Sequence, residues 1–315
     1  MRVESSGIPG IFARETSCVS EPSFDLSKAA RLARAIWQYG EPVHAVIYYA
    51  SERKEATDKL GLKGGWMSYF GCRAAPLGAA SAATVTAVFF NFHPTMIGRS
   101  IPDAWTYASP TDLLESRVTA MDAALRRVLG DEIVRSAAVG RAASLAATAV
   151  AECDLSGRPM GSANQAVAFP DEPHVKLWQA LTTIREARGD GHVDSLVRTG
   201  ISPSEALVLQ SATGRSPEDG LRANRGWSDE EWDAAAAALL SRGWIDTEGR
   251  ITAAGAEVRD EVEGSTDRLA EPIVTALGDG GAEELVALLR PLAERVMDSG
   301  AVPAHNNMGV PWPPP

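Results

Sequence analysis

The sequence predicts a mainly helical protein, and three observations support this fold class. Apolar residues recur every three or four positions over several long segments, as they do on the buried face of an α-helix. Serine, aspartate or proline begins most of these segments and glycine often follows them, which is typical of helix boundaries. Segments that alternate apolar and polar residues are few and short, so we expect little β-structure.

Four segments carry the clearest helical pattern, and the first three begin at a residue that caps helices. We expect these helices to begin at Asp25, Ser109, Asp171 and about Glu283. The helix from Ser109 is expected to end at Gly130. The alanine-rich segment 137–151 is interrupted by Gly140 and Arg141, so we interpret it as a buried helix rather than a membrane span.

Residues 201–265 show a more specific order of elements. Helices are expected at 204–212, at 217–224 and from Ser228, two short strands at 244–246 and 250–252, and a closing helix after Thr252. Three helices, a hairpin and a helix form the order of a winged helix. Residues 85–129 show a similar order without a hairpin pattern after Gly130, so a tandem pair of winged helices stays open.

The chain is thus expected to contain a helical N-terminal domain and a winged-helix module with a short β-hairpin. The expected order is a flexible tail (1–24), a helical domain that is open to interpretation as a degenerate winged helix (25–155), connecting helices (156–200), the winged-helix-like module (201–265), C-terminal helices (266–298) and a proline-rich tail (299–315). Trp312 in the last tail has a large apolar surface, which favours docking on the body.

Several segments together carry a resemblance to known proteins. They are EPVHAVIYYA (41–50), GWMSYFGCRAAPLG (65–78), FFNFHP (89–94), IPDAW (101–105), DEPHVKLWQALTTIREARGDGHV (171–193) and GWSDEEW (226–232). Through them, residues 28–298 resemble a group of uncharacterised actinobacterial helix-turn-helix proteins. The segment ITAAG with VRDEVEGSTDRL resembles the wing and closing helix of MarR-type proteins. The resemblance implies a shared fold and brings no reaction and no catalytic residue.

Whole-chain composition excludes several classes of function. The net charge of −11 opposes non-specific binding to nucleic acid and anionic lipid. No stretch of about 18 uncharged apolar residues occurs, and residues 1–24 lack a signal-peptide pattern, so we expect a cytoplasmic protein without a membrane partner. Cys18, Cys72 and Cys153 form no CxxC pair, which indicates reduced thiols rather than disulfides or a zinc site.

The winged-helix-like module is too acidic to recognise DNA through its third helix in the usual way. Residues 201–265 hold 13 acidic residues and 6 arginines, a net charge of −7, and no lysine. The helix expected to enter the major groove begins with Asp229, Glu230 and Glu231, and residues 234–238 are alanines that cannot pair with base edges. We therefore do not expect sequence-specific DNA binding. Residues 31–75 hold seven basic and four acidic residues, a mild excess that we interpret as a solvated face.

The densest polar cluster lies at 185–192, where Gly189 and Gly191 predict a turn between two helices. Asp190 is a candidate to orient His192 as a general base, with Glu186 as a third catalytic candidate. The alternative is structural, with Asp190 as the cap of a following helix.

A cluster of aromatic residues with polar residues between them is the part of the chain best suited to line a small-molecule pocket. The candidate ligand-binding residues are His44, Tyr48, Trp66, Tyr69, Arg73, Asn91, His93, Trp105, Trp178 and Arg185. The alternative interpretation is an aromatic core. The five histidines show no metal-ligand spacing, and no phosphate loop or GxSxG motif occurs, so no metal and no cofactor are expected.

The leading hypothesis is the binding of an apolar or aromatic small molecule in a cleft on a winged-helix scaffold. Three alternatives stay open: a cofactor-independent enzyme with an Asp-oriented histidine as general base, a MarR-type transcription regulator, and a nucleic-acid repair enzyme on tandem winged helices. The expected partner is a small-molecule ligand, and a homodimer stays open. The sequence does not decide whether the protein is an enzyme.

Overall fold

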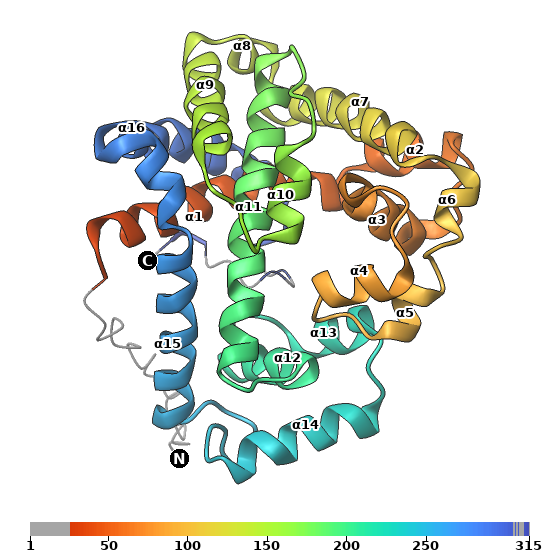
Figure 1. Cartoon of the computed structure of the whole chain (residues 1–315), viewed down its shortest axis with the longest axis vertical. Helices are drawn as coiled ribbons and strands as arrows, with labels where there is room; N and C mark the ends of the chain where they lie inside the picture. The colour runs from red at the N-terminus through yellow and green to blue at the C-terminus, as the bar shows by residue number, and fades with distance from the viewer. Residues whose placement is uncertain (1–25, 305, 307, 309–311, 315) are drawn as a thin grey trace, which may run out of the picture.

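The computed structural model describes residues 26–304, 306, 308 and 312–314, and helices dominate this part of the chain (Figure 1). The N-terminal part contains α1 (Lys28–Tyr49), α2 (Ser51–Lys59), α3 (Gly64–Ala74), the 3-10 helix η1 (Ala75–Leu77), α4 (Ala82–Val88), α5 (Pro94–Gly98), α6 (Ala104–Tyr107), α7 (Pro110–Leu129) and α8 (Asp131–Val134). The remainder contains α9 (Ala137–Glu152), α10 (Pro159–Gln165), α11 (Pro173–Arg198), α12 (Pro203–Ala212), α13 (Glu218–Arg225), α14 (Asp229–Ser241), α15 (Ala253–Leu269) and α16 (Glu271–Asp298). The predicted mainly helical fold class is confirmed.

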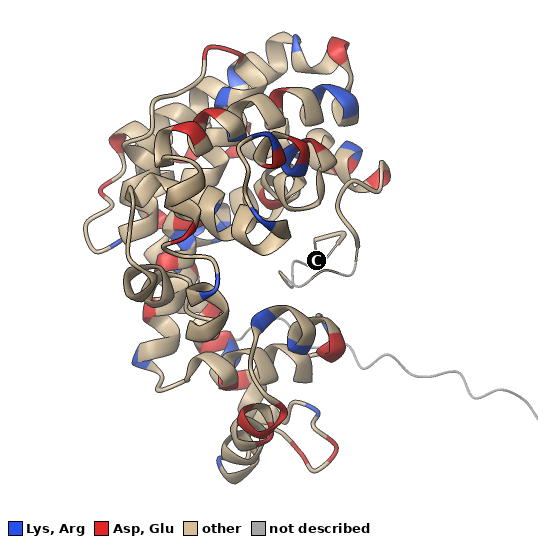
Figure 2. Ribbon diagram, turned by 90° about the vertical axis from the view of Figure 1, so that its right-hand side faces the viewer, with Lys and Arg blue, Asp and Glu red and all other residues tan. Residues whose placement is uncertain are grey.

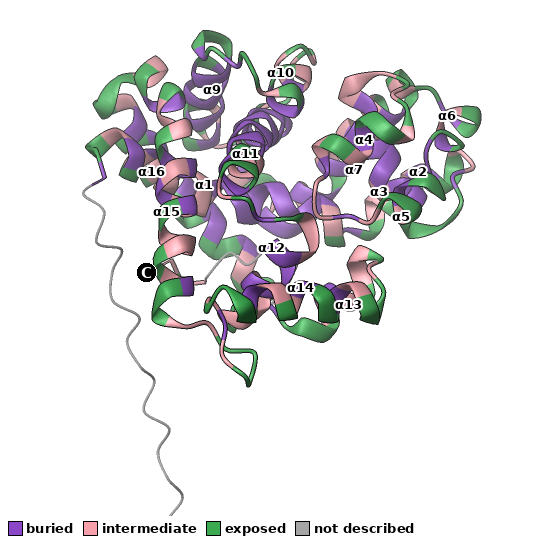
Figure 3. Ribbon diagram, turned by 60° about the horizontal axis from the view of Figure 1, so that its bottom comes forward, coloured by how far each residue is buried: buried purple, intermediate pink, exposed green. Residues whose placement is uncertain are grey.

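The central element is α11, which is buried along most of its length (Figure 3). It packs with α1, α7, α9 and α16 around the largest apolar core, in which Trp178 is fully buried. The Trp178 indole Nε1 donates a hydrogen bond to the His44 carbonyl oxygen at 3.2 Å, which fixes α11 against α1. None of the described helices combines the length and hydrophobicity needed to cross a lipid bilayer.

Two smaller cores flank this centre. The first is aromatic, lies around α3 to α6, and includes Phe70, Phe89 and Phe92. The second holds together what we call the α12–α15 module (residues 203–269), in which Leu207, Leu221, Trp232 and Leu239 are buried. The sides of α13 and α14 that face away from this core are largely exposed, whereas α12 has no exposed residue (Figure 3).

Local capping explains where the helices begin. Ser109 and Asp112 form a reciprocal capping box at the start of α7, and Gly130 ends this helix with φ of 89°. The predicted α7 boundaries are therefore confirmed. The chain then continues into α8 and α9, so no hairpin follows α7 and the second winged helix considered from the sequence lacks its wing.

The predicted turn at Gly189 and Gly191 is wrong, because α11 continues through both residues to Arg198. A Cβ atom at Gly191 would lie 2.4 Å from Arg158 Nη1. That guanidinium donates to the carbonyl oxygens of Ala187 and Leu269, at 3.1 Å in both cases. The glycine allows close packing on a helix rather than a turn.

The β-hairpin expected in the α12–α15 module is also not formed as two strands. Among the described residues, the segment contains one isolated antiparallel bridge, between Ile245 and Ile251. The Asp246 carboxylate accepts hydrogen bonds from the backbone amides of Glu248 and Arg250, at 3.0 and 2.8 Å, and so holds the turn. The ladder is not longer because α14 ends at Ser241 and α15 begins at Ala253, with Thr252 as its N-cap.

The described residues of the C-terminal tail lie against the body of the protein. The Trp312 ring meets the Tyr39 ring edge-on with centroids 6.5 Å apart. Ser216 Oγ donates to the Asn306 carbonyl oxygen at 3.2 Å, and Asn306 is buried. These contacts agree with the docking that we expected for Trp312.

Candidate functional site

A large cleft separates the N-terminal helices from the α12–α15 module. Its volume is about 1190 Å³, somewhat above the range of roughly 300 to 1,000 Å³ that is usual for small-molecule sites. The wall is built by residues of α1, α2, α3, the segment after α4, α11, α12, α13 and α15. The site therefore depends on contacts between segments that are far apart in the sequence.

An ion-pair network ties three of these elements together. Arg73 of α3 binds both carboxylate oxygens of Glu186 on α11, with nitrogen–oxygen distances of 2.8 and 2.9 Å. Arg185 donates to the same carboxylate at 3.0 Å and lies 3.4 Å from the Glu41 carboxylate of α1. Burial alone would raise the pKa of Glu186, but the Arg73 and Arg185 charges outweigh it and hold this pKa far below its usual range.

A second polar chain lies along the contact between α1 and α11. His44 Nε2 lies 2.9 Å from Tyr48 Oη, and His44 Nδ1 lies 3.0 Å from Thr182 Oγ1. The Thr182 hydroxyl already donates to the Trp178 carbonyl oxygen, so His44 Nδ1 is the donor to Thr182 and Nε2 accepts from Tyr48. Burial lowers the pKa of His44 well below its usual value, so the ring is neutral.

Aromatic rings form the wall opposite α11. Trp66 packs edge-on against Tyr69 and Phe92, with centroid distances of 5.7 and 6.0 Å, and is itself 38% exposed. Guanidinium groups lie over two rings: the Arg73 carbon is 4.1 Å from the Phe89 centroid and the Arg225 carbon is 4.7 Å from the Phe92 centroid. The wall thus presents apolar faces and positive charge side by side.

Most of the predicted site residues line this cleft. They are Tyr48, Trp66, Tyr69, Arg73, Asn91, Arg185, Glu186, Asp190 and His192. His44 and Trp178 instead line a small inner cavity of about 20 Å³, which Tyr48, Tyr69, Arg73 and Glu186 also border. The cavity is large enough for a single water molecule.

Two predicted ligand residues, His93 and Trp105, line neither the cleft nor the inner cavity. His93 Nδ1 accepts from the Thr95 amide at 3.1 Å and so caps α5, while its Nε2 lies 3.2 Å from Glu231 of α14. The Trp105 indole donates to the Ala80 carbonyl oxygen at 2.9 Å and packs on the aromatic core. Both residues are structural, and His93 joins the N-terminal helices to the α12–α15 module.

Asp190 and His192 bind different partners. Asp190 Oδ2 accepts from the Gly161 amide at 2.8 Å, near the start of α10. His192 Nδ1 lies 3.1 Å from Thr266 Oγ1 of α15, so Asp190 does not orient this ring as predicted. Burial raises the pKa of Asp190 to about 6 and lowers the pKa of His192. The alternative interpretation, in which Asp190 caps a helix, is closer to the structure. The helix that Asp190 caps is α10, however, rather than the next helix in the chain.

Sequence reasoning missed ten of the charged residues that line the cleft, and seven of them are arginines. These ten are Arg31, Arg34, Glu41, Arg53, Arg188, Arg215, Arg225, Arg259, Asp260 and Glu263. The basic excess in residues 31–75 was the one available indication, and we had interpreted it as a solvated face. Instead, Arg31, Arg34, Arg53 and Arg73 point to the cleft from α1, α2 and α3.

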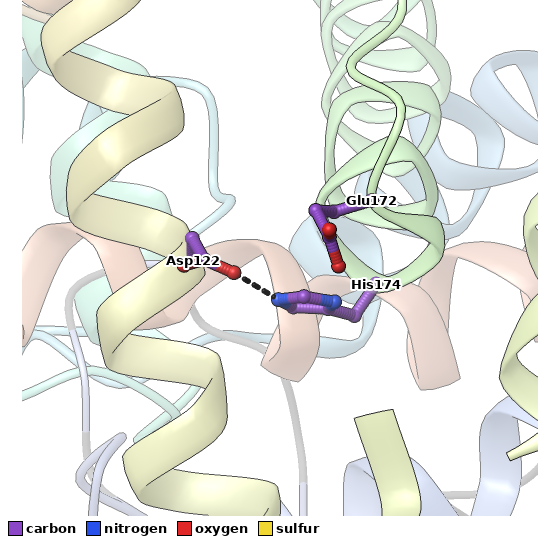
Figure 4. A group of neighbouring side chains, drawn as sticks. All are labelled: Asp122, Glu172 and His174. Carbon is purple, nitrogen blue, oxygen red and sulfur yellow. Dashed lines mark hydrogen bonds and ion pairs between the residues drawn. The ribbon is translucent and has the colours of Figure 1, made fainter. Parts of the chain in front are cut away.

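A separate group outside the cleft has donor atoms close enough for a metal ion: Asp122, Glu172 and His174 (Figure 4). His174 Nε2 lies 2.7 Å from Asp122 Oδ1. Arg126, however, donates to Asp122 at 2.9 Å and to Glu172 at 3.0 Å, so a guanidinium already binds both carboxylates. The group is an ion-pair network that joins α7 to the start of α11.

Comparison with known proteins gives one match. Residues 33–303, most of the chain, match the model of a helix-turn-helix family. The chain belongs to this helix-turn-helix family. No curated protein and no solved structure matches the chain. Membership confirms the predicted helix-turn-helix character of the protein, and α12 to α14 are the helices to which we had assigned it.

Proposed function

We propose that the protein binds a planar aromatic anion in the cleft between the N-terminal helices and the α12–α15 module. The proposal keeps the small aromatic ligand inferred from the sequence and adds negative charge to it. It needs no cofactor and no reaction.

The charge of the cleft wall carries this proposal. Among the described residues that line the cleft, nine are arginines: Arg31, Arg34, Arg53, Arg73, Arg185, Arg188, Arg215, Arg225 and Arg259. Five are carboxylates: Glu41, Glu186, Asp190, Asp260 and Glu263. The whole chain has the opposite balance, with 41 acidic and 30 basic residues. An excess of guanidinium groups inside an acidic protein favours a bound anion, because partly buried charge is costly without compensation.

The aromatic half of the cleft supports a planar ligand. Arg53, Arg73, Arg185 and Arg225 lie there with two carboxylates, Glu41 and Glu186. Arg53 donates to the Ile47 carbonyl oxygen and the Ser68 hydroxyl, which are neutral partners. Burial lowers the pKa of Arg225, and the Arg73 and Arg185 charges lower it further. A ring stacked near Trp66 with an anionic group toward these arginines would satisfy both features.

Titration with anilinonaphthalene sulfonate tests the proposal, because this dye combines a planar aromatic system with a permanent negative charge and fluoresces when bound. We expect saturable binding at one site on the folded protein. Arg225→Met keeps the apolar contact with Phe92 and removes the charge, so we expect the Kd to rise about tenfold or more.

Arg198→Met is the matched control, because Arg198 is exposed at the end of α11 and does not line the cleft. Its Kd should equal that of the wild type. Loss of affinity in both variants, or no saturable binding to protein with an unchanged melting curve, would refute the proposal.

Family membership favours a second candidate function, a DNA-binding regulator, and the MarR-like resemblance of the ITAAG segment points the same way. The cleft wall includes Asn224 and Arg225 of α13 and Arg259 of α15, so a ligand would contact the α12–α15 module directly. Such contacts would bias the position of this module. A mobility-shift experiment with genomic DNA fragments tests this candidate.

A further inference from the structure

We infer that the carboxyl group of Glu41 contacts the bound anion directly and takes up a proton when the anion binds. The inference rests on the proposed function and refines it. Glu41 would make the protein selective for anions that offer an acceptor oxygen beside the charge, such as aromatic sulfonates and carboxylates.

The carboxylate of Glu41 lines the cleft, and its hydrogen bonding within the described residues is incomplete. The residue lies on α1, is 3% exposed and lines the cleft. Its Oε1 lies 3.4 Å from Arg185 Nε, which is a long contact for an ion pair, and its buried Oε2 has no hydrogen-bond partner among the described residues. Glu186, by contrast, uses both oxygens in contacts of 2.8 to 3.0 Å.

A buried polar atom of this kind calls for a partner. When protonated, Glu41 gains an O–H donor. A sulfonate or carboxylate oxygen held by Arg185 could accept a hydrogen bond from this donor. A carboxylate at Glu41 would instead repel the anion.

The groups around Glu41 set the direction of its proton equilibrium. Arg185, Glu186 and Arg188 face it from α11, and Tyr49 faces it from its own helix. Burial raises the pKa of Glu41 and the Glu186 charge adds to this, while Arg185 and Arg188 oppose it. An arriving anion adds negative charge and raises this pKa further. The proton comes from solvent, ends on the Glu41 carboxylate, and no bond of the ligand is broken.

Proton uptake on binding determines whether the affinity for the anion rises or falls with pH. Affinity for a permanently charged anion should be highest at low pH and should fall as pH rises through the titration of Glu41 in the free protein. One linked proton gives a fall of at most about tenfold for each pH unit. Glu41→Gln imitates the protonated form, so its affinity should stay high and vary little with pH.

The experiment measures the Kd of anilinonaphthalene sulfonate from pH 5 to pH 8.5 for the wild type, Glu41→Gln and Asp190→Asn. Asp190 also lines the cleft and has a pKa of about 6, so it is the competing source of a pH effect. We expect the slope of log Kd against pH to vanish in Glu41→Gln and to persist in Asp190→Asn. Calorimetry of the wild type in two buffers with different ionisation heats should count up to one proton taken up.

The outcomes separate the two proposals. If the wild type does not bind the dye at any pH, the proposed function fails. If it binds and Glu41→Gln keeps the wild-type slope, or Asp190→Asn loses it, the present inference is overturned while the proposed function stands. Should Glu41→Gln fail to fold, proton uptake near zero across the pH range in the wild type, or uptake lost in Asp190→Asn, would still overturn it.

Discussion

Arginines occupy two different settings in this protein. On the outer surface of the α12–α15 module, Arg222 pairs with Glu218, Asp229 and Asp233, and Arg250 pairs with Asp246 and Glu248. Acidic and basic residues share the same short segments of this module (Figure 2). The cleft is lined by nine arginines and five carboxyl groups, and two of these arginines, Arg34 and Arg188, pair with Asp267, which does not line the cleft.

This difference indicates where a bound anion would gain the most favourable electrostatic energy. An anion at the outer surface meets arginines that already pair with acidic neighbours and whose charge is screened by solvent. Exposed ion pairs of this kind contribute little to the free energy of binding or folding. An anion in the cleft meets arginines in a partly buried aromatic setting, where electrostatic interactions are stronger. We therefore expect an anion to bind inside the cleft rather than along α14.

The largest expected effect comes from breaking the buried network of the cleft. Glu186→Gln leaves Arg73 and Arg185 without their shared charge, and removing one partner of a buried pair costs about 3 to 5 kcal/mol. Folding lowers the pKa of Glu186 from its ordinary value of 4.5. The charged carboxylate therefore stabilises the folded state fully above pH 4.5, and this stabilisation is lost as pH falls through the lowered pKa. The wild-type contribution should therefore be complete at pH 7.

Denaturant unfolding at pH 7 measures this loss. Glu284→Gln is the matched control, because Glu284 pairs with Arg141 on the surface and both side chains are about half exposed, at 43% and 54%. We expect a change of less than about 1 kcal/mol there. Equal destabilisation in the two variants would show that cleft and surface pairs do not differ as we argue.

A smaller effect is expected at Asp190, a cleft carboxyl that forms no ion pair within the described residues. Its pKa rises from the ordinary 3.8 to about 6 through burial. The folded state therefore holds the proton over a range where the unfolded state has released it, and this contribution to stability is lost as pH rises through about 6.

Asp190→Asn should remove that part of the pH dependence while its amide oxygen still accepts from the Gly161 amide. Between pH 5 and pH 7.5 the melting temperature of the variant should fall less than that of the wild type, by a few degrees. An identical fall in both proteins would assign the pH dependence to other groups.

Local rules predicted much of the fold. The Ser109 capping box and Gly130 bound α7 as the sequence indicated, because caps depend on neighbours three residues apart. The same rules failed at Gly191, where a contact with Arg158, 33 positions earlier, decides the conformation. They failed again for the hairpin, which is reduced to one bridge because α15 begins at Ala253, two residues after Ile251.

The candidate site was predictable only in part for the same reason. Trp66, Tyr69 and Arg73 lie one helical turn apart, so their shared position was visible in the sequence. Arg225 and Arg259 reach the cleft from α13 and α15, and no local pattern connects them to α3. His93 lies beside the aromatic residues in sequence, yet it faces Glu231 instead.

The last prediction is an absence of effect. The exposed face of α14 carries Asp229, Glu230 and Asp233, followed by Ala234 and Ala237, and no basic residue of this helix is available to phosphates. Arg222, which contacts this helix from α13, already pairs with Asp229 and Asp233 and stacks on Trp232 at 4.7 Å, and Arg242 at the C-cap pairs with Glu205. Negative side chains at 87% and 76% exposure repel phosphates over about 8 Å at physiological salt.

We therefore expect no retardation of genomic DNA fragments in a mobility-shift experiment, or weak retardation that a modest increase in salt removes, because it would rest on few phosphate contacts. Arg222→Ala should not change this result. Tight, salt-resistant binding to one DNA site that Arg222→Ala abolishes would contradict the comparison between cleft and surface. In that case the arginines outside the cleft would act on nucleic acid despite their acidic neighbours, and the regulator that family membership favours would become the leading function.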